Sequence, residues 1–401
     1  MGPSRLWLAV RAWGVSLLLL LAVAWPATAH GRREHADPEL LNHWRVQVHL
    51  LFQWGHLVAF GLWVGGSLGA SRLLRLPLER LLFGSWALFL VSLGTGSYNM
   101  EFGAATPDSP DILSLPAFSR RYEFGAAYII LVGVKQGLFL LAVLLTLAVT
   151  ILHLRWPPAR DRSGLRRAFV GGSATLGLAV AAVTSMVLVL HEAVDLAPTP
   201  LHSLGGVVGP QGAEEFLPAE AARRTAPPPY GTDTRTATAG FRLFTLPRAA
   251  GDALARFGHL IGFALWVGGT AAMMLTLDED GPRRVLPLLW LGLGVLGVSG
   301  IYQMMSWTPF SIVPIPSRLS LMEHYRFGYT YTLLLTAKLG LAGLGLLGTT
   351  GLAIAARQHA VAGRGRKWIR RFGWLNLVAA LGLAYVAVAL LLVHEGVDHA
   401  L

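Results

Sequence analysis

The chain carries the sequence GHLVAFGLWVGG at residues 55–66 and repeats it as GHLIGFALWVGG at residues 258–269, an offset of 203 positions. Further stretches match at the same offset or one residue more: YEFG at 122–125 with YRFG at 325–328, Lys135 with Lys338, HEAVD at 191–195 with HEGVD at 394–398, and GSY at 96–98 with GIY at 300–302. Repetition at a nearly fixed spacing indicates a duplicated structural unit, with one copy in each half of the chain.

The composition is that of a membrane protein. Of the 401 residues, 54% are hydrophobic and 14% are charged, whereas soluble domains contain roughly 25% charged residues. A transmembrane helix needs a run of about 20 mainly apolar residues. The sequence predicts an all-α fold, a polytopic membrane protein with eight transmembrane helices. The expected spans are 46–74, 80–100, 125–153, 168–194, 252–277, 285–305, 328–356 and 372–397.

Basic residues mark one side of the predicted helices. The connections after the first, third, fifth and seventh spans are rich in arginine. Positive charge in short loops marks the cytoplasmic side, so both termini are expected to be extracytoplasmic, in a bacterial inner (plasma) membrane. Each copy then has four spans, an even number, which predicts two parallel four-helix-bundle repeats. The net charge of +11 is explained by this topology, with the lipid bilayer as partner and no nucleic acid.

The segments outside the spans complete the predicted organisation. Residues 1–29 read as a signal peptide, with Arg5 and Arg11 before an apolar stretch and an A-x-A-like site ending at Ala29. An uncleaved first helix is the alternative. The remaining predicted parts are a polar N-terminal segment at 30–45, a first membrane repeat at 46–195, an extracytoplasmic linker rich in Pro, Ala and Thr at 196–250, and a second membrane repeat at 251–401.

Ionisable residues inside the apolar spans are the candidates for function, because membranes tolerate them rarely. His56 and Lys135 each lie about ten residues into their spans from the outer side, which is ~15 Å deep. His191 lies nearer the outer end of the fourth span, and Asp195 follows it by one turn, so its carboxylate can orient the imidazole. The matched residues of the second copy are His259, Lys338, His394 and Asp398.

We interpret the four histidines as candidate metal ligands, and the two lysines and two aspartates as their charge or hydrogen-bonding partners. The alternatives are core histidines held by hydrogen bonds and, for the HExxD stretches, a polar cap at the membrane interface. The sequence has no cysteine, which excludes disulfides, cysteine-ligated zinc, iron–sulfur clusters and covalent c-type haem.

Other residues near these histidines have two interpretations each. Trp63 and Trp266 follow the first-helix histidines by seven residues on the same helical face, so they either pack in a core or line a flat cofactor. The glycine pairs at 65–66 and 268–269 are interpreted as positions where helices approach closely. After signal-peptide cleavage His30 would carry the free α-amine and, with His35, form a candidate copper-capture site; a disordered tail is the alternative.

The first and third helices of each copy resemble the copper resistance D (CopD) family. The shared features are His-x6-Trp-Val-Gly-Gly in the first helix and a Tyr-x6-Lys pattern in a later one, here Tyr128 to Lys135 and Tyr331 to Lys338. The resemblance covers about residues 45–195 and 250–398, so the chain is similar to a tandem duplication of that domain. It implies an inner-membrane protein that handles copper, often beside a periplasmic copper carrier of the CopC type. A similar arrangement of His and Lys occurs in the HemJ family, which is associated with haem.

Three functions remain open from the sequence. The first, and the leading expectation, is copper transport or resistance through the four histidines, which the family resemblance favours. The second is a bis-His b-type di-haem protein for electron transfer or haem-linked oxidation, with the lysines on propionates and the tryptophans along the rings. The third is a structural subunit whose polar residues only lock helices together. A protonated lysine beside a histidine would repel a copper cation, so for copper the lysine would have to be neutral or paired, whereas a haem would make use of its charge. An oxidoreductase is expected only if haem is bound.

Overall fold

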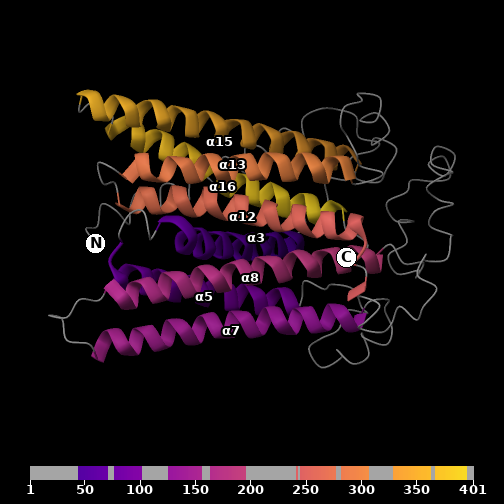
Figure 1. The fold of residues 1–401 in the computed structure, drawn as a ribbon. Coiled ribbons are helices and arrows are strands. Elements are labelled where there is room, and N and C mark those ends of the chain that lie inside the picture. Colours follow the sequence, from indigo (N-terminus) through magenta and orange to yellow (C-terminus); the bar gives the residue numbers. More distant parts are fainter. Residues whose placement is uncertain are drawn as a thin grey trace.

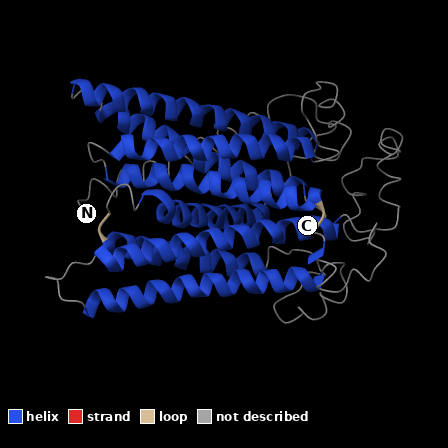
Figure 2. Ribbon diagram, in the orientation of Figure 1, coloured by secondary structure: helices blue, strands red, loops and turns tan. Residues whose placement is uncertain are grey.

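The protein is built from long helices (Figures 1 and 2). The computed structural model describes residues 44–70, 76–101, 125–155, 163–195, 241–242, 244–276, 281–306, 328–362 and 366–394, and no strand occurs among them. The elements are α3 (Trp44–Gly65), the π-helical η2 (Gly66–Ala70), α5 (Leu78–Glu101), α7 (Gly125–Arg155), α8 (Ser163–Asp195), α12 (Pro247–Thr276), α13 (Gly281–Ser306), α15 (Gly328–Ala362) and α16 (Arg366–His394). Among these residues, eight helices are long and apolar enough to cross a membrane, which confirms the all-helical membrane fold.

The helix ends differ from the expected spans in a consistent way. Helix α8 begins at Ser163 rather than 168, α16 begins at Arg366 rather than 372, and α15 continues to Ala362 rather than 356. Hydropathy marks only the apolar part of a helix, whereas backbone hydrogen bonding continues through its polar ends. The first span also differs, because its last described residues form the π-helical turn η2, which no apolar pattern distinguishes from α-helix.

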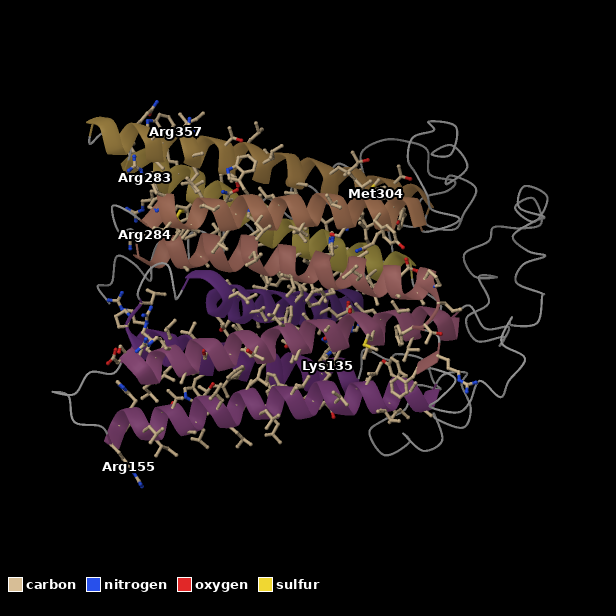
Figure 3. The ribbon with its side chains drawn as sticks, in the orientation of Figure 1. Lys135, Arg155, Arg283, Arg284, Met304 and Arg357 are labelled. Atoms are coloured by element: carbon tan, nitrogen blue, oxygen red, sulfur yellow. The ribbon has the colours of Figure 1, made fainter. Side chains whose placement is uncertain are left out.

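Several arginines gather at one end of the described helices. Figure 3 shows the arginines that lie together at this end, on α7, α13 and α15: Arg155, Arg283, Arg284 and Arg357. Met304 lies near the opposite end of α13, and Lys135 lies between the two ends. The side chains of the bundle therefore divide into a basic end and a middle that carries few charges, as a membrane requires.

Each half of the chain closes on itself through its helix contacts. Residues 44–195 are called the first half here, and residues 247–394 the second half. In the first half α3 contacts α5, α5 contacts α7, α7 contacts α8, and α8 contacts α3. In the second half α12, α13, α15 and α16 make the corresponding contacts. The first and third helices of each half therefore stand diagonally across a group of four, so residues on their inner faces look toward one another.

The two halves meet through their first helices, α3 and α12, at a pair of glycines. A Cβ atom added to Gly268 would lie 2.6 Å from the Cα of Gly65, and one added to Gly65 would overlap the carbonyl oxygen of Ala264. Backbones approach this closely only where side chains are absent. For Gly65 and Gly268 the predicted role in close helix packing is therefore confirmed. Both glycines lie nine residues after the first-helix histidine of their half.

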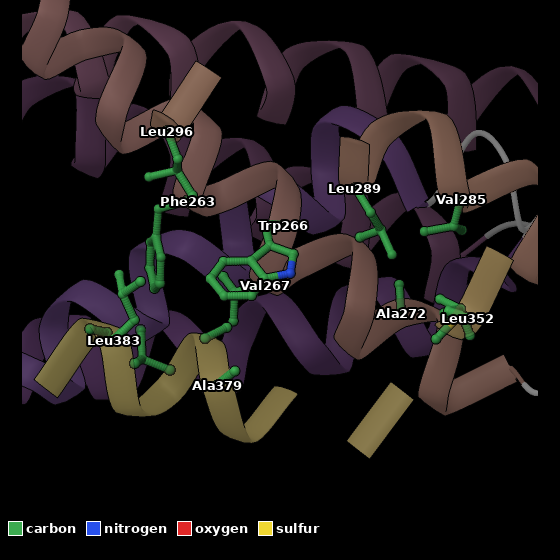
Figure 4. Close-up of a cluster of buried hydrophobic side chains, with 14 of the residues drawn as sticks. Phe263, Trp266, Val267, Ala272, Val285, Leu289, Leu296, Leu352, Ala379 and Leu383 are labelled. Carbon is green, nitrogen blue, oxygen red and sulfur yellow. The ribbon is translucent and has the colours of Figure 1, made fainter. Parts of the chain in front are cut away.

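Apolar side chains fill the interior and also cover the outside. Trp266 is fully buried in the largest cluster, among side chains of α12, α13 and α16 that include Phe263, Leu289 and Leu383 (Figure 4). On the outside, Phe83 is 76% exposed and Val298 is 73% exposed. Large apolar side chains so exposed on long helices are in keeping with a surface that contacts lipid.

Candidate functional site

His56 lies on α3 and is held by the neighbouring helix α5. Its Nδ1 atom is 3.1 Å from Thr95 Oγ1. The Thr95 hydroxyl is itself 2.7 Å from the carbonyl oxygen of Val91, one turn earlier on α5. A hydroxyl on a helix commonly donates its single proton to the carbonyl four residues before it. Thr95 then has only lone pairs left to offer the imidazole.

This arrangement assigns the tautomer of His56. Because the Thr95 oxygen can only accept, Nδ1 of the imidazole must carry the proton and donate it. In the neutral ring, Nε2 is consequently the unprotonated nitrogen, with its lone pair available. Metal-ligating histidines are commonly fixed in this manner, through the ring nitrogen that does not bind the metal.

The second half repeats the arrangement with a different hydroxyl. His259 Nδ1 on α12 is 3.1 Å from Ser299 Oγ on α13, and Ser299 Oγ donates to the carbonyl oxygen of Val295 at 2.6 Å. The same reasoning places the proton on Nδ1 of His259 and leaves Nε2 as the acceptor. Ser299 is buried, with 7% of its surface exposed. In both helix pairs, α3 with α5 and α12 with α13, the imidazole is thus held in the same tautomer, with its proton on Nδ1.

The imidazole edges show which way Nε2 points. A Cβ atom on Gly96 would lie 3.2 Å from Cε1 and 3.6 Å from Nδ1 of His56, and Gly300 stands likewise beside His259. The Nδ1–Cε1 edge of each ring therefore faces the second helix of its half. Nε2 lies farther from that helix, on the other side of the ring.

Lys135 and Lys338 lie on the diagonal helices, α7 and α15. The charge of Lys135 acts on the His56 ring, and that of Lys338 acts on the His259 ring. Lys135 follows buried Leu131 by four residues and precedes buried Ala142 by seven, so it lies on the inward face of α7. The sequence predicted that His56 and Lys135 share a depth, and the structure places Lys135 near enough for its charge to act on the His56 ring.

Neither lysine has a carboxylate partner among the described residues. Within the described ranges, both lysines are half-buried, and no ion pair or hydrogen bond joins either one to another described side chain. A cation at this membrane depth costs at least a few kcal/mol unless it is paired or neutralised. Each lysine therefore needs an acceptor or an anion that the described side chains do not supply.

A polar stripe, which the sequence pattern did not reveal, precedes each of the two histidines. In the first half the stripe is His49 and Gln53, with Gln53 Nε2 2.7 Å from His49 Nε2. In the second half the matched residues are Asp252 and Arg256. These side chains lie seven and three residues before the histidine, spacings that place them on its helical face. The helical spacing of these residues could have revealed the stripe in the sequence. It was not recognised because the two halves have different residue types at these positions.

Thr95 and Ser299 were missed as well. They occupy matched positions, each one residue before the glycines at 96 and 300. Both are small hydroxyl residues inside an apolar span, a common and unremarked feature of transmembrane helices. Only the pairing of α3 with α5, and of α12 with α13, shows that each hydroxyl lies against a histidine.

The two tryptophans are buried in the apolar interior. Trp63 is 4% exposed and packs edge-on against Phe89, with ring centroids 5.2 Å apart. Trp266 is fully buried and packs against Gly345 on the diagonal helix α15. Neither indole N–H has a hydrogen-bond acceptor among the described residues. Both indole rings therefore pack in the apolar interior of their halves. A role for them in lining a cofactor stays a prediction.

The remaining predicted site residues lie where side chains are not described. His191 and Asp195 belong to the last turns of α8, and His394 is the last residue of α16. His30, His35 and Asp398 lie outside the described residues. Among the side chains that the structure does describe, no three His, Asp or Glu residues lie close enough to hold one metal ion. Whether His191 reaches His56, or His394 reaches His259, stays a prediction.

Comparison with family models, curated proteins and solved structures adds no relative to this picture. No family model, no curated protein and no solved structure matches the chain. The site must therefore be interpreted from its own chemistry. In each half that chemistry consists of a neutral imidazole, which a hydroxyl holds through Nδ1, and a lysine on the diagonal helix.

Proposed function

We propose that the protein is a di-haem b membrane protein for electron transfer or haem-linked oxidation, with one haem in each half. In this proposal the two halves are parallel four-helix repeats that follow a signal peptide. They lie in a bacterial inner membrane with both termini outside. His56 and His259 would each hold a haem iron through Nε2. His191 and His394 are the candidates for a second iron ligand.

The observation that carries the proposal is a neutral imidazole on the first helix and a lysine without a described partner on the diagonal helix, twice in one chain. A lone copper ion beside His56 would meet the positive charge of Lys135, and like charges repel strongly at low dielectric. A haem brings its own carboxylates, so the same lysine would pair with a propionate. Both features of the site then have a use, and the cost of the unpaired lysine is removed.

The residues present fit such a group by their chemistry. Imidazole is an ordinary axial ligand of haem iron, and histidines of a helical bundle can supply it from facing helices. Thr95 and Ser299 would fix the ligand tautomer, and the lysines would hold the acidic edge of the ring system. A bound haem would supply one-electron chemistry, which these side chains cannot perform themselves.

Copper handling is the second candidate, and the fixed histidine tautomer is the observation that favours it. A neutral imidazole with a free Nε2 is also a good copper ligand. The resemblance to the CopD family implies copper transport or resistance, with capture at His30 and His35 and delivery by a carrier of the CopC type. In that case Lys135 and Lys338 would have to be neutral when the ion is bound.

A spectrum of the purified protein tests both candidates. The protein is produced in cells able to make haem, purified in detergent, and measured air-oxidised and dithionite-reduced, with iron and copper content determined in parallel. We expect a Soret band and sharp bands on reduction, with about half the haem lost in His56→Ala or His259→Ala. His153→Ala is the matched control, because His153 lies at the basic end of α7, near Glu79.

Each other outcome contradicts the haem proposal. A featureless visible spectrum with bound copper that both histidine substitutions release would replace haem by copper. A protein with neither haem nor copper would contradict both candidates and leave the structural role. Haem that survives the double substitution His56→Ala/His259→Ala would show that other residues bind the iron.

A further inference from the structure

Positive charge is concentrated where α15 ends and α16 begins. Residues 357–371 contain six arginines or lysines and no aspartate or glutamate. Arg357, on α15, lies at the basic end of the molecule (Figure 3). Helix α15 ends at Ala362 and α16 begins at Arg366, so the first turn of α16 lies at the same end.

The cations of this turn are exposed and have no carboxylate near them on the neighbouring helices. Lys367, Arg370 and Arg371 are all exposed, and their spacings of three and four residues place them side by side on α16. Helices α13, α15 and α16 contain no aspartate or glutamate. Like charges at these spacings repel one another, and an anion bound between them removes that repulsion.

Two other exposed arginines at the basic end have acidic residues close to them in the sequence. Arg80 follows Glu79 at the start of α5, and Arg283 follows the acidic stretch at 278–280. The cluster of Lys367, Arg370 and Arg371 has no such acidic neighbour within residues 357–371. Its charge is therefore available to an anion from outside the chain.

An exposed tryptophan lies within the cluster. Trp368 is 49% exposed, and its ring stacks on that of Phe372, with centroids 5.9 Å apart. The guanidinium carbon of Arg371 lies 5.0 Å from the centre of the Trp368 ring. Tryptophan at the end of a membrane helix typically lies at the level of the lipid headgroups, and the planar donors of a guanidinium match two oxygens of a phosphate. The cluster thus combines phosphate-binding donors with an aromatic ring suited to the membrane boundary.

The surface farther into the membrane is apolar. Helix α15 packs along α16, and its residues Leu347, Ile354 and Arg357 share one helical face through spacings of seven and three. Leu347 and Ile354 are exposed apolar side chains, and Arg357 is exposed at the end of that face. An apolar face that ends in a cation matches a phospholipid, whose acyl chains continue from a charged headgroup. A free phosphate ion has no part that would use the apolar face.

We propose that the start of α16 binds the headgroup phosphate of an anionic phospholipid through Lys367, Arg370 and Arg371. Trp368 lies beside the glycerol part of the lipid, and the acyl chains lie against exposed apolar side chains of the neighbouring helix α15. A lipid with a cationic headgroup group of its own gains less from these residues, because its phosphate charge is already cancelled. This inference is independent of the proposed function, and the presence or absence of haem does not decide it.

Counting the lipids bound to purified protein tests the inference. The full chain in a neutral detergent is titrated with phosphatidylglycerol, which is anionic, and separately with phosphatidylcholine, which is neutral overall. Native mass spectrometry counts the bound lipids, with inorganic phosphate added as a competitor in a parallel series. Arg370→Gln/Arg371→Gln removes two cations of the cluster. Arg80→Gln/Arg283→Gln is the matched control, because it removes the same charge from two exposed arginines outside the cluster.

We expect wild-type protein to bind the first phosphatidylglycerol on the order of tenfold more tightly than phosphatidylcholine. Each cation near an anionic lipid surface strengthens binding about fivefold, so Arg370→Gln/Arg371→Gln should weaken phosphatidylglycerol binding roughly 20-fold. Its binding of phosphatidylcholine should stay unchanged, and the control should behave as wild type towards both lipids. Trp368→Leu should weaken both lipids alike, since the ring contacts a part that they share.

Four outcomes would overturn the inference. Equal affinity of wild-type protein for the two lipids would remove its basis, and so would unchanged phosphatidylglycerol binding in Arg370→Gln/Arg371→Gln. An equal loss in the control variant would show that the basic end attracts the lipid as a whole, without a site on α16. Displacement of phosphatidylglycerol by inorganic phosphate would assign the cluster to a soluble anion. Circular dichroism of each variant checks that its helices are intact, so that a loss of binding is not a loss of folding.

Discussion

The hydroxyl that fixes each histidine provides the sharpest test of the site. Thr95→Val keeps the shape of the side chain but removes the oxygen that accepts the hydrogen from His56 Nδ1, 3.1 Å away. The imidazole then has a donor without its main acceptor, which costs about 1–3 kcal/mol, and it is freer to adopt the other tautomer. Loss of such an orienting partner lowers metal affinity by roughly 10–100-fold. We expect haem release from the first half to accelerate by a factor in that range.

The assay follows the loss of Soret absorbance as haem transfers to an excess of a haem-binding globin. Thr95→Ser is the matched control, because Ser299 already performs this function in the second half at the same 3.1 Å distance. Thr175→Val is a second control, since Thr175 bonds only to the backbone of its own helix. Equal release rates for Thr95→Val and Thr95→Ser would refute the assigned tautomer.

Three further predictions concern the lysines and the helix packing. Lys135→Met and Lys338→Met should each weaken haem binding on the order of tenfold, the effect of one charge-assisted hydrogen bond, whereas a purely structural role predicts unchanged binding. Gly268→Ala should lower unfolding stability in a denaturant titration by about 1–3 kcal/mol, because the new Cβ would lie 2.6 Å from a backbone atom of α3; Gly294→Ala, which meets nothing within 4 Å, should not. Asn376→Leu should cost a similar 1–3 kcal/mol, since it removes the buried partner of a hydroxyl on α15, and an unchanged unfolding midpoint would contradict this.

The sequence predicted the number and order of the described helices because apolar length is a strong signal for a membrane span. It was less informative about where helices end, since the polar ends of α8 and α16 are helical without being hydrophobic. It also predicted the close packing at Gly65 and Gly268, because two adjacent small residues in a span have few other uses.

The site was predicted only in part, for a physical reason. His56 and Lys135 stand out in the sequence because each is ionisable and surrounded by apolar residues. Thr95 does not stand out, since its role depends on which helix lies beside α3, and pairing between helices leaves little trace in one sequence. Arg256 was overlooked because its counterpart, Gln53, is uncharged. A search for residues that are identical in the two halves does not find such a position. The differences between the halves were as informative as the matches.

The contact between Gly65 and Gly268 also sets the mechanics of the molecule. Each histidine lies nine residues from its contact glycine, about 13–14 Å along its own helix. The helices α3 and α12 thus cross at this glycine pair, and each carries its histidine at the same distance from the crossing point. A small change in the crossing angle would alter the separation of the two histidines while leaving Thr95 and Ser299 in place beside them. A larger side chain at Gly65 or Gly268 should therefore change how the two histidine sites affect one another before it changes the structure of either site.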